Sequence, residues 1–594
     1  MQRRQFLRNT LLTGATLPAL VACLGSNDRN NDGQTTLPGE QVRPERVDQL
    51  IAPQAFVNGV ASGDPSHDQL IVWTALTPAT REQSEDIPVS LEYVVGAEWM
   101  DDDDAWPTAF ATPAQVKKLG FFLAKAARDY TIKVDLGNVE LYRGTRFGLG
   151  ELTALPPASV IYYRFRAGSQ VSRIGRARTL GVGDSVQQAR FAVTSCSNFP
   201  AGLFSVYEMV SQQEDLDFVV HLGDYIYEYG EGQYADVAGL NRIPEPPHEM
   251  ISREDYVLRH AQYKRDPQLQ RLHARYPMIV VWDDHEITND AWREGAENHT
   301  EGAEGNYAER LGFAIRAYFN WMPLREQFAR DSITLVPDAR EVIYRRIRVG
   351  SLLDMIMLDT RIVGRDEQAS LPAIDPSRND ANRSLLGDQQ RQWLQLKLLE
   401  AKNQGATWTF LGQQVMFGQL NLVELPAVKL LGQQLLGNLV ALNNDQWDGY
   451  TAERNRIREF VKAIGLQNLV VLTGDIHTSW AIELYENPFI LLGDRLQQPF
   501  GVEFVTPSVT SPGFPDEVAD LVSTVIPVAN PHIKYSELKT KGYLLVDVTR
   551  ERTTAQWRYA ASITDPNLIG EERVNMRKTF QVLAGSNRLQ AISA

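Results

Sequence analysis

The sequence holds 594 residues, which exceeds the usual size of one domain and predicts at least two. Its composition, with 43% hydrophobic and 22% charged residues, is ordinary for a globular protein. The formal net charge of −15 argues against a general nucleic-acid-binding protein. The same acidic balance suits a protein that holds hard cations, although most acidic proteins hold none.

The first 23 residues have the order of an export signal. An Arg-Arg pair precedes an apolar stretch over 11–22, which is too short to span a bilayer as a helix. The RRxFL pattern resembles the twin-arginine signal, so the twin-arginine machinery is an expected partner and the periplasm or cell envelope the expected location. Leu-Val-Ala-Cys at 20–23 resembles a lipobox, which predicts lipidation of Cys23 and a membrane anchor. The alternative is ordinary cleavage after Ala22.

A tether and a β-sandwich are expected next. Residues 24–45 are polar and rich in Gly, Asn and Asp, which predicts a flexible tether. Strand-like runs broken by Gly, Asp and Pro turns follow, with no convincing amphipathic helix between most of them. They predict an N-terminal β-sandwich domain over 46–182.

From about residue 188 the pattern changes to apolar strand-like runs that alternate with helix-like stretches. This alternation predicts an α/β catalytic domain over 188–560, which ends in a hairpin at 541–560. The helix-like stretches lie at 252–266, 305–322 and 387–405. The remaining tail, 561–594, is expected to include a helix.

Six reactive residues come directly after apolar runs: Cys196, Asp224, Asp283, Asp284, Asp359 and Asp475. Ligands of α/β proteins bind outside the carboxyl ends of strands, so these residues predict one shared site. Asp475 and His477 stand two apart on an extended segment and therefore face the same side. Taken singly, each residue has an ordinary structural interpretation, and their common position carries the prediction.

The residue types predict a metal centre with two kinds of ligand. A thiolate from Cys196 and a phenolate from Tyr227 need a strongly Lewis-acidic ion, such as ferric iron or zinc, to stay deprotonated. Carboxylates and amides such as Asp284 and Gln413 suit calcium or magnesium. The sequence therefore indicates a mixed site.

Long motifs stand in order along the chain. They include TSCSN at 194–198, HLGDYIYEYG at 221–230, VWDDHEITNDAW at 281–292, LTGDIHTSWA at 472–481 and EFVTPSVTSPG at 503–513. With these motifs the sequence, from about residue 52 to 560, resembles the PhoD-type alkaline phosphatase (alkaline phosphatase D) family of the metallophosphoesterase superfamily. The resemblance implies an αββα sandwich core, with two facing sheets flanked by helices, after an immunoglobulin-like N-terminal β-sandwich.

The resemblance also implies a centre of Fe³⁺ and Ca²⁺. The implied iron ligands are Cys196, Asp224, Tyr227 and His477. The implied calcium ligands are Asp224, Asp284 and Asp475. Further candidates for metal or phosphate contacts are Asn198, Asp283 and Gln413.

The expected reaction is in-line attack of metal-activated water on a phosphate ester. Arg361 is the candidate for stabilising charge on the equatorial oxygens, with a salt bridge to Asp359 as its alternative role. His285 is placed to protonate the leaving alkoxide. The predicted function is an exported phosphoesterase acting on mono- and diesters. The alternatives are a phospholipase-like phosphodiesterase acting on lipid headgroups or wall polymers, and a non-catalytic surface binding lipoprotein.

Overall fold

The structure is a computed structural model. It describes residues 43–592 apart from 139–152, 327–342, 370–375, 421–443, 487, 489–497 and short breaks between 516 and 529. The expected export signal, Cys23 and most of the expected tether lie outside the described residues. In the described part of the chain, no helix combines the length and apolar character that a bilayer span requires.

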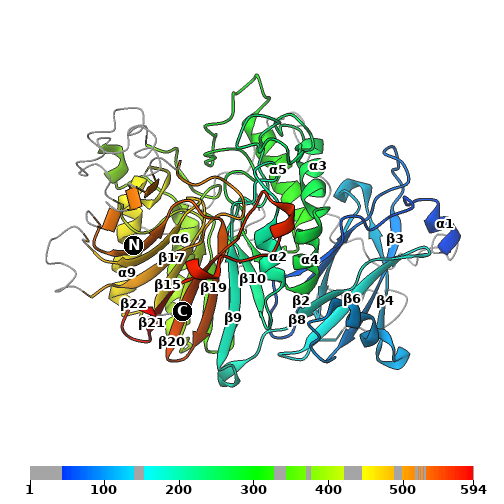
Figure 1. Ribbon diagram of the computed structural model, residues 1–594, viewed down its shortest axis with the longest axis horizontal. Helices are drawn as coiled ribbons and strands as arrows, with labels where there is room; N and C mark the ends of the chain where they lie inside the picture. Colours follow the sequence, from blue (N-terminus) through cyan, green and yellow to red (C-terminus); the bar gives the residue numbers. More distant parts are fainter. Residues whose placement is uncertain are drawn as a thin grey trace, which may run out of the picture.

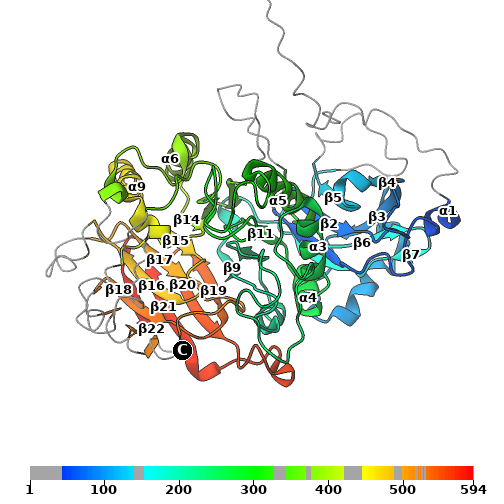
Figure 2. The same cartoon turned by 90° about the horizontal axis from the view of Figure 1, so that it is seen from above.

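The N-terminal part of the chain is a two-sheet sandwich, drawn in blue to cyan in Figures 1 and 2. One sheet contains β3 (Ile87–Val95), β4 (Lys117–Ala124), β6 (Val160–Ala167), β7 (Gln170–Val171) and β8 (Gly175–Arg178). The opposite face is made by β1 (Val60–Gly63), β2 (Leu70–Ala75) and β5 (Thr131–Leu136). Buried apolar side chains from both faces form one core, as the strand-like runs predict.

The second face of this sandwich continues into the rest of the molecule. β1 pairs in parallel with β11 (Met278–Val280) and so joins a ten-stranded sheet of order β22-β21-β20-β19-β9-β10-β11-β1-β2-β5. The remaining strands are β9 (Gln188–Thr194), β10 (Phe218–His221), β19 (Gly542–Thr549), β20 (Arg552–Tyr559), β21 (Lys578–Leu583) and β22 (Leu589–Ile592). Gly63 permits this pairing, because a Cβ there would lie 2.7 Å from the carbonyl oxygen of Met278.

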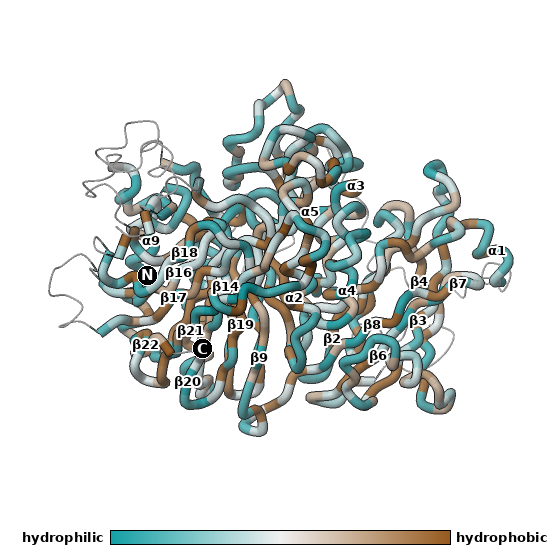
Figure 3. Tube along the Cα trace, viewed as in Figure 1, coloured by the Kyte–Doolittle hydropathy of each residue, from teal (hydrophilic) through white to brown (hydrophobic). Residues whose placement is uncertain are grey.

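A seven-stranded sheet of order β12-β13-β14-β15-β17-β16-β18 faces the ten-stranded sheet. Its strands are β12 (Arg345–Val349), β13 (Leu353–Met357), β14 (Trp408–Gln413), β15 (Leu469–Thr473), β16 (Ser479–Leu484), β17 (Gly501–Val505) and β18 (Ile533–Glu537). Side chains of both sheets share one core, in which the rings of Phe191 and Phe410 lie 5.9 Å apart. Hydrophobic colouring is concentrated along the strands at the centre of Figure 3.

Helices cover the outer faces of the two sheets. Beside the ten-stranded sheet lie α2 (Ser205–Ser211), α3 (Arg253–Lys264), α4 (Pro267–Arg275) and α5 (Tyr307–Trp321). Beside the seven-stranded sheet lie α6 (Gly387–Asn403) and α9 (Thr451–Ile464). The expected αββα core is confirmed, and α3, α5 and α6 match the three helix-like stretches of the sequence.

In the described part of the tail, 561–592, the expected helix is limited to two short 3₁₀ helices. After two short 3₁₀ turns, the chain forms β21 and β22, which extend the ten-stranded sheet. Phe580 and Val582 alternate with more exposed residues and bury their side chains, and Phe580 packs against Trp557. This period of two is the pattern of a strand.

Candidate metal centre

The candidate residues lie on loops that follow parallel strands of the two facing sheets. β9, β10 and β11 are parallel in the ten-stranded sheet, and β13, β14 and β15 are parallel in the seven-stranded sheet. The loops after these strands carry Cys196, Asp224, Asp283, Asp284, Arg361, Asp475 and His477. Loops after parallel strands gather at the carboxyl edge of a sheet, so the two edges together enclose one site.

Four candidate ligands have a left-handed backbone, with φ of 61° at Cys196, 55° at Asp224, 59° at Asp475 and 62° at His477. Residues other than glycine rarely adopt this region, and each such residue costs roughly 1–3 kcal/mol. Strained residues of this kind cluster at functional sites, where the surrounding structure holds them in place. Here the strain aims side chains from separate loops at one point.

Gly223 allows two of these loops to approach each other. Its φ is 102°, and a Cβ at this position would lie 2.4 Å from the Cβ of Asp283. Glu286 fastens the same loops, because its carboxylate accepts hydrogen bonds from the backbone N–H groups of Asp224 at 3.0 Å and Asp283 at 2.7 Å. The 223–224 and 283–286 segments therefore form one rigid unit.

Cys196, Asp224, Tyr227 and His477 form a group that we call the mixed-donor cluster. Ligand atoms of the Cys, Asp and His lie within 4.8 Å of one another. The Tyr227 hydroxyl donates to Asp224 Oδ2 at 2.9 Å and lies 3.2 Å from His477 Nε2. His477 Nδ1 lies 2.8 Å from the carbonyl oxygen of Pro512, which orients Nε2 toward the cluster. The structure thus gathers the four residues that the resemblance assigns to iron.

Asp283, Asp284 and Asp475 form the neighbouring carboxylate cluster, whose ligand atoms also lie within 4.8 Å of one another. Asp224 and Asp284, with His285, form a third such group, so Asp224 and Asp284 connect the two clusters. Calcium accepts six to eight oxygen ligands, and a set of adjacent carboxylates is the donor type that it prefers.

Three carboxylate oxygens of this region, Asp224 Oδ1, Asp283 Oδ2 and Asp284 Oδ1, are buried without a hydrogen-bond partner. A buried charged oxygen that lacks a partner costs several kcal/mol unless a cation contacts it. Burial, followed by the neighbouring carboxylates and against the effect of Arg361, raises the pKa of Asp475 to about 7. The carboxylates therefore need additional positive charge, which fits bound metal ions.

The thiol and the phenol have the same need. Burial first, and the negative charge of Asp224 second, raise the pKa values of Cys196 and Tyr227 well above their usual range. A coordinating cation reverses this effect, because it stabilises the thiolate and the phenolate directly. The donor set therefore fits a metal ion that is a strong Lewis acid.

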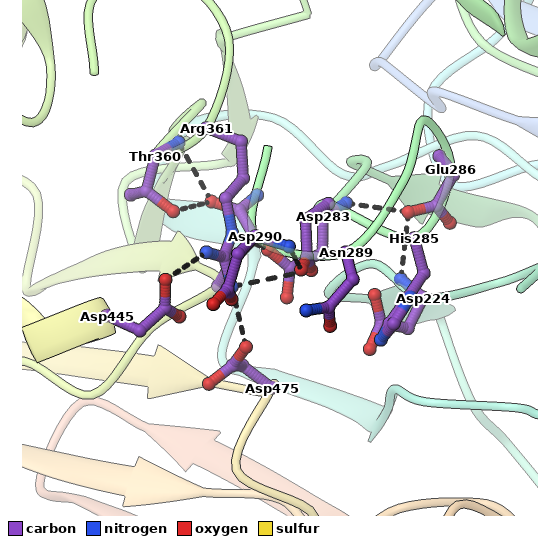
Figure 4. A network of polar contacts seen from close by, with 12 residues as sticks. Asp224, Asp283, His285, Glu286, Asn289, Asp290, Thr360, Arg361, Asp445 and Asp475 are labelled. Carbon is purple, nitrogen blue, oxygen red and sulfur yellow. Dashed lines mark hydrogen bonds and ion pairs between the residues drawn. The ribbon is translucent and has the colours of Figure 1, made fainter. Parts of the chain in front are cut away.

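Arg361 lies at the centre of a network of polar contacts, shown in Figure 4. Its buried guanidinium donates to Asp475 Oδ1 at 2.6 Å, to Asp445 Oδ1 at 2.7 Å and to Asp283, and it lies 3.4 Å from Asp284. Asp359 instead accepts a hydrogen bond from the backbone N–H of Arg361 at 2.9 Å. The alternative role, a salt bridge between the Arg361 and Asp359 side chains, is therefore not the arrangement that the structure shows.

His285 lies beside both clusters. Its Nδ1 is 2.7 Å from Glu228 Oε2, and Glu228 also accepts from the backbone N–H of Asn289 at 2.7 Å. Burial lowers the pKa of His285, but the charges of Glu228, Asp224 and Asp284 outweigh it and raise this pKa well above the usual value. With Nδ1 engaged by Glu228, the imidazole can act as a proton donor through Nε2.

Two further candidates are not part of either cluster. Gln413 donates to Thr473 Oγ1 at 2.6 Å and accepts from the Trp447 indole N–H at 3.0 Å, so protein groups engage both ends of its amide. Asn198 donates its side-chain amide to the carbonyl oxygen of Tyr234 at 3.3 Å. In the structure, both amides contact neighbouring protein groups.

The sequence analysis missed Asp445 and Gln446. Asp445 accepts hydrogen bonds from Arg361 and Arg365, and Gln446 donates to Asp475 Oδ2 at 2.6 Å. Neither residue follows an apolar strand, so the signal that identified the other candidates is absent here. The run NNDQW is polar and ends in an aromatic residue, which is the only local hint.

Comparisons with known proteins identify the family of this chain. The model of the PhoD-like phosphatase family matches residues 191–557, and the model of its N-terminal domain matches residues 42–146. The chain belongs to the PhoD-like phosphatase family. It is 33% identical over 552 residues to alkaline phosphatase D of Bacillus subtilis (strain 168), covering 91% of this chain and 82% of the relative.

Solved structures agree with this assignment. A structure of PhoD matches with a TM-score of 0.73 and 32% identity, over 92% of this chain and 93% of that one. A purple acid phosphatase from yellow lupin (Lupinus luteus) seeds matches with a TM-score of 0.51, over 88% of this chain and 74% of that one, at 11% identity. The second likeness concerns the fold alone. The protein is thus a hydrolase of the PhoD-like phosphatases, with residue clusters that fit metal ions.

Proposed function

We propose that the protein is an exported, metal-dependent phosphoesterase that hydrolyses phosphate mono- and diesters. Three buried carboxylate oxygens that lack a hydrogen-bond partner and lie close to one buried arginine are the observation that supports this proposal most. Cys196, Asp224, Tyr227 and His477 would hold Fe³⁺, and Asp224, Asp284 and Asp475 would hold Ca²⁺. When bound, the two cations supply a water of lowered pKa and offset the negative charge of the phosphate.

The side chains of the protein have separate roles in this reaction. Arg361 is a planar donor fork held in place by Asp445, and it is the candidate for stabilising charge on the phosphoryl oxygens. His285 holds one ring nitrogen on Glu228 and offers the proton of the other to the leaving oxygen. Asp283 contacts Arg361 and orients it rather than the substrate.

The test begins with the purified protein. Elemental analysis is expected to find iron and calcium, and the protein is expected to hydrolyse both an aryl phosphate monoester and a bis-aryl phosphate diester. Cys196→Ala is expected to remove the iron together with any visible phenolate-to-iron absorption from Tyr227. Absence of turnover with either ester class contradicts the proposed function, and retained colour and activity in Cys196→Ala contradict the ligand assignment. Phospholipid included as a substrate tests the phospholipase-like alternative.

We also propose export by the twin-arginine route and lipid anchoring at Cys23. The RRxFL pattern and the Leu-Val-Ala-Cys run support this proposal. Cys23→Ser is expected to move the exported protein from the membrane fraction to the released fraction. Replacing both signal arginines by lysine is expected to leave the protein in the cytoplasm. An unchanged distribution in either variant rejects the corresponding part of the proposal.

A further inference from the structure

A group of aromatic rings lies directly beside the metal centre. The rings of Tyr229 and Tyr234 are 5.0 Å apart at an angle of 35°, and Tyr234 is nearly parallel to Tyr227 at 6.0 Å. All three come from the segment that follows Asp224. Rings that pack against one another in this way form a rigid aromatic surface with little conformational entropy to lose.

Tyr229 and Tyr234 differ from Tyr227 in burial and in hydrogen bonding. Tyr227 is buried, and its hydroxyl contacts Asp224, His477 and Ser511. Tyr229 and Tyr234 are partly exposed, and within the described residues their hydroxyls have no hydrogen-bond partner. Contacts within the centre therefore account for Tyr227, whereas Tyr229 and Tyr234 keep a partly exposed surface.

These partly exposed rings lie next to His285, the candidate proton donor. The ring of His285 is 5.5 Å from that of Tyr229 and 6.4 Å from that of Tyr234. Glu228 engages His285 Nδ1, so Nε2 is the atom that can donate to a leaving oxygen. A group attached to this oxygen would therefore lie against the two tyrosines.

The loop that carries Tyr234 is fixed to the centre. The Asn198 side chain, two residues after Cys196, donates to the carbonyl oxygen of Tyr234 at 3.3 Å. Val237 N–H donates to the carbonyl oxygen of Pro200 at 3.1 Å.

We infer that Tyr229 and Tyr234 form a stacking subsite for a planar ring in the leaving group. The inferred substrates are aryl or nucleoside phosphate esters, because every such ring offers a flat π-face to a tyrosine. This inference rests on the proposed function and narrows its substrate class. A quaternary ammonium group is disfavoured, since two rings form one surface rather than a cage and the nearby Glu228 already binds His285 and Asn289.

The test measures selectivity with the metal-loaded full chain. The kcat/KM of a nucleoside phosphate ester is divided by the kcat/KM of glycerol phosphate for the wild type, Tyr229→Ala, Tyr234→Ala and the matched Tyr→Phe variants. Each alanine variant is expected to lower this ratio about tenfold, because it removes the ring on which the base stacks. The phenylalanine variants keep the ring and are expected to keep the ratio.

A second measurement is inhibition by a free nucleoside, whose Ki is expected to rise about tenfold in the alanine variants only. An equal loss on both esters indicates a structural role and overturns the inference. A loss confined to a choline phosphate ester indicates a cation site and also overturns it. Iron content is measured in every variant, so that metal loss is recognised. No turnover of any ester by the wild type would reject the proposed function itself, which is a separate outcome.

Discussion

The two clusters of the candidate centre contain different types of ligand. The mixed-donor cluster contains a thiol and a phenol, whose pKa values are raised by burial and by the charge of Asp224, so these two ligands stay uncharged until a cation binds. The carboxylate cluster already contacts the guanidinium of Arg361, which balances part of its charge. The mixed-donor cluster therefore depends on a metal ion to deprotonate its thiol and phenol. The carboxylate cluster depends on Arg361 to offset the charge of its buried carboxylates.

The largest expected effect follows from removing that arginine. Arg361→Met is expected to lower kcat/KM about a thousandfold, which is the upper end for loss of one charge-stabilising donor. The metal-free variant is also expected to be about 3–5 kcal/mol less stable, because Asp283, Asp445 and Asp475 lose their buried partner. Steady-state kinetics and urea unfolding measure the two effects. Arg361→Lys retains the charge without the fork and should fall between; a Met variant within tenfold of the wild type contradicts the assigned role.

The next effect concerns the proton donor between the clusters. His285→Asn is expected to lower kcat about a hundredfold for alkyl esters, whose leaving oxygens need a proton. The loss should shrink for aryl esters with acidic leaving groups. A plot of log kcat against leaving-group pKa checks this difference in slope. Glu228→Gln, which changes only the partner of His285, should lose less; a uniform loss across all esters argues against proton donation.

Two substitutions at residues that contact a ligand test the two clusters separately. Ser511 donates to the Tyr227 hydroxyl at 2.6 Å in the mixed-donor cluster, and Gln446 donates to Asp475 Oδ2 at 2.6 Å in the carboxylate cluster. Each of Ser511→Ala and Gln446→Leu is expected to weaken one metal about tenfold and to leave the other nearly unchanged. Competitive chelation followed by elemental analysis reads both metals at once. Equal weakening of both metals in either variant would mean that the clusters do not act separately.

A last effect concerns the pH dependence of the stability of the metal-free protein. Asp475 has a pKa of about 7 when folded, raised chiefly by burial, against a usual value of 3.8. A raised folded pKa gives a contribution to stability that is present below the unfolded pKa and is lost as pH rises through the folded one. Chelated protein should therefore lose stability between about pH 4 and pH 7. Urea midpoints across this range test the trend, which Asp475→Asn should flatten; a midpoint that rises with pH and is unaffected by the substitution contradicts it.

The sequence could predict the centre where local pattern and topology agree. Cys196, Asp224 and Asp475 each follow a buried strand, and parallel strands must bring their carboxyl ends to one edge. The αββα layers follow from the same alternation of apolar runs and helices. Arg361 was also identified as a candidate from the sequence, although its contacts with four carboxylates were not predicted.

Other features depend on contacts between distant segments. Asp445 contacts Arg361, which lies 84 positions earlier in the sequence, and no local periodicity predicts such a contact. Glu228 stands in a motif that the sequence shows, but its role needs the position of the His285 ring 57 positions later. The tail strands β21 and β22 were missed because each is short and pairs at the sheet margin, where the pattern of Phe580 and Val582 is weak evidence alone.

Through the pairing of β1 with β11, the N-terminal sandwich covers one edge of the catalytic sheet. Without β1, the backbone N–H and C=O groups of β11 would form an open edge in the middle of the molecule, next to the loop that carries Asp283. Open edges of this kind recruit strands from other chains and lead to aggregation. The sandwich moves the free edge outward to β5, at the far end of the sheet from the tail strands. The N-terminal part of the chain therefore covers a strand edge that could otherwise pair with another copy of the protein.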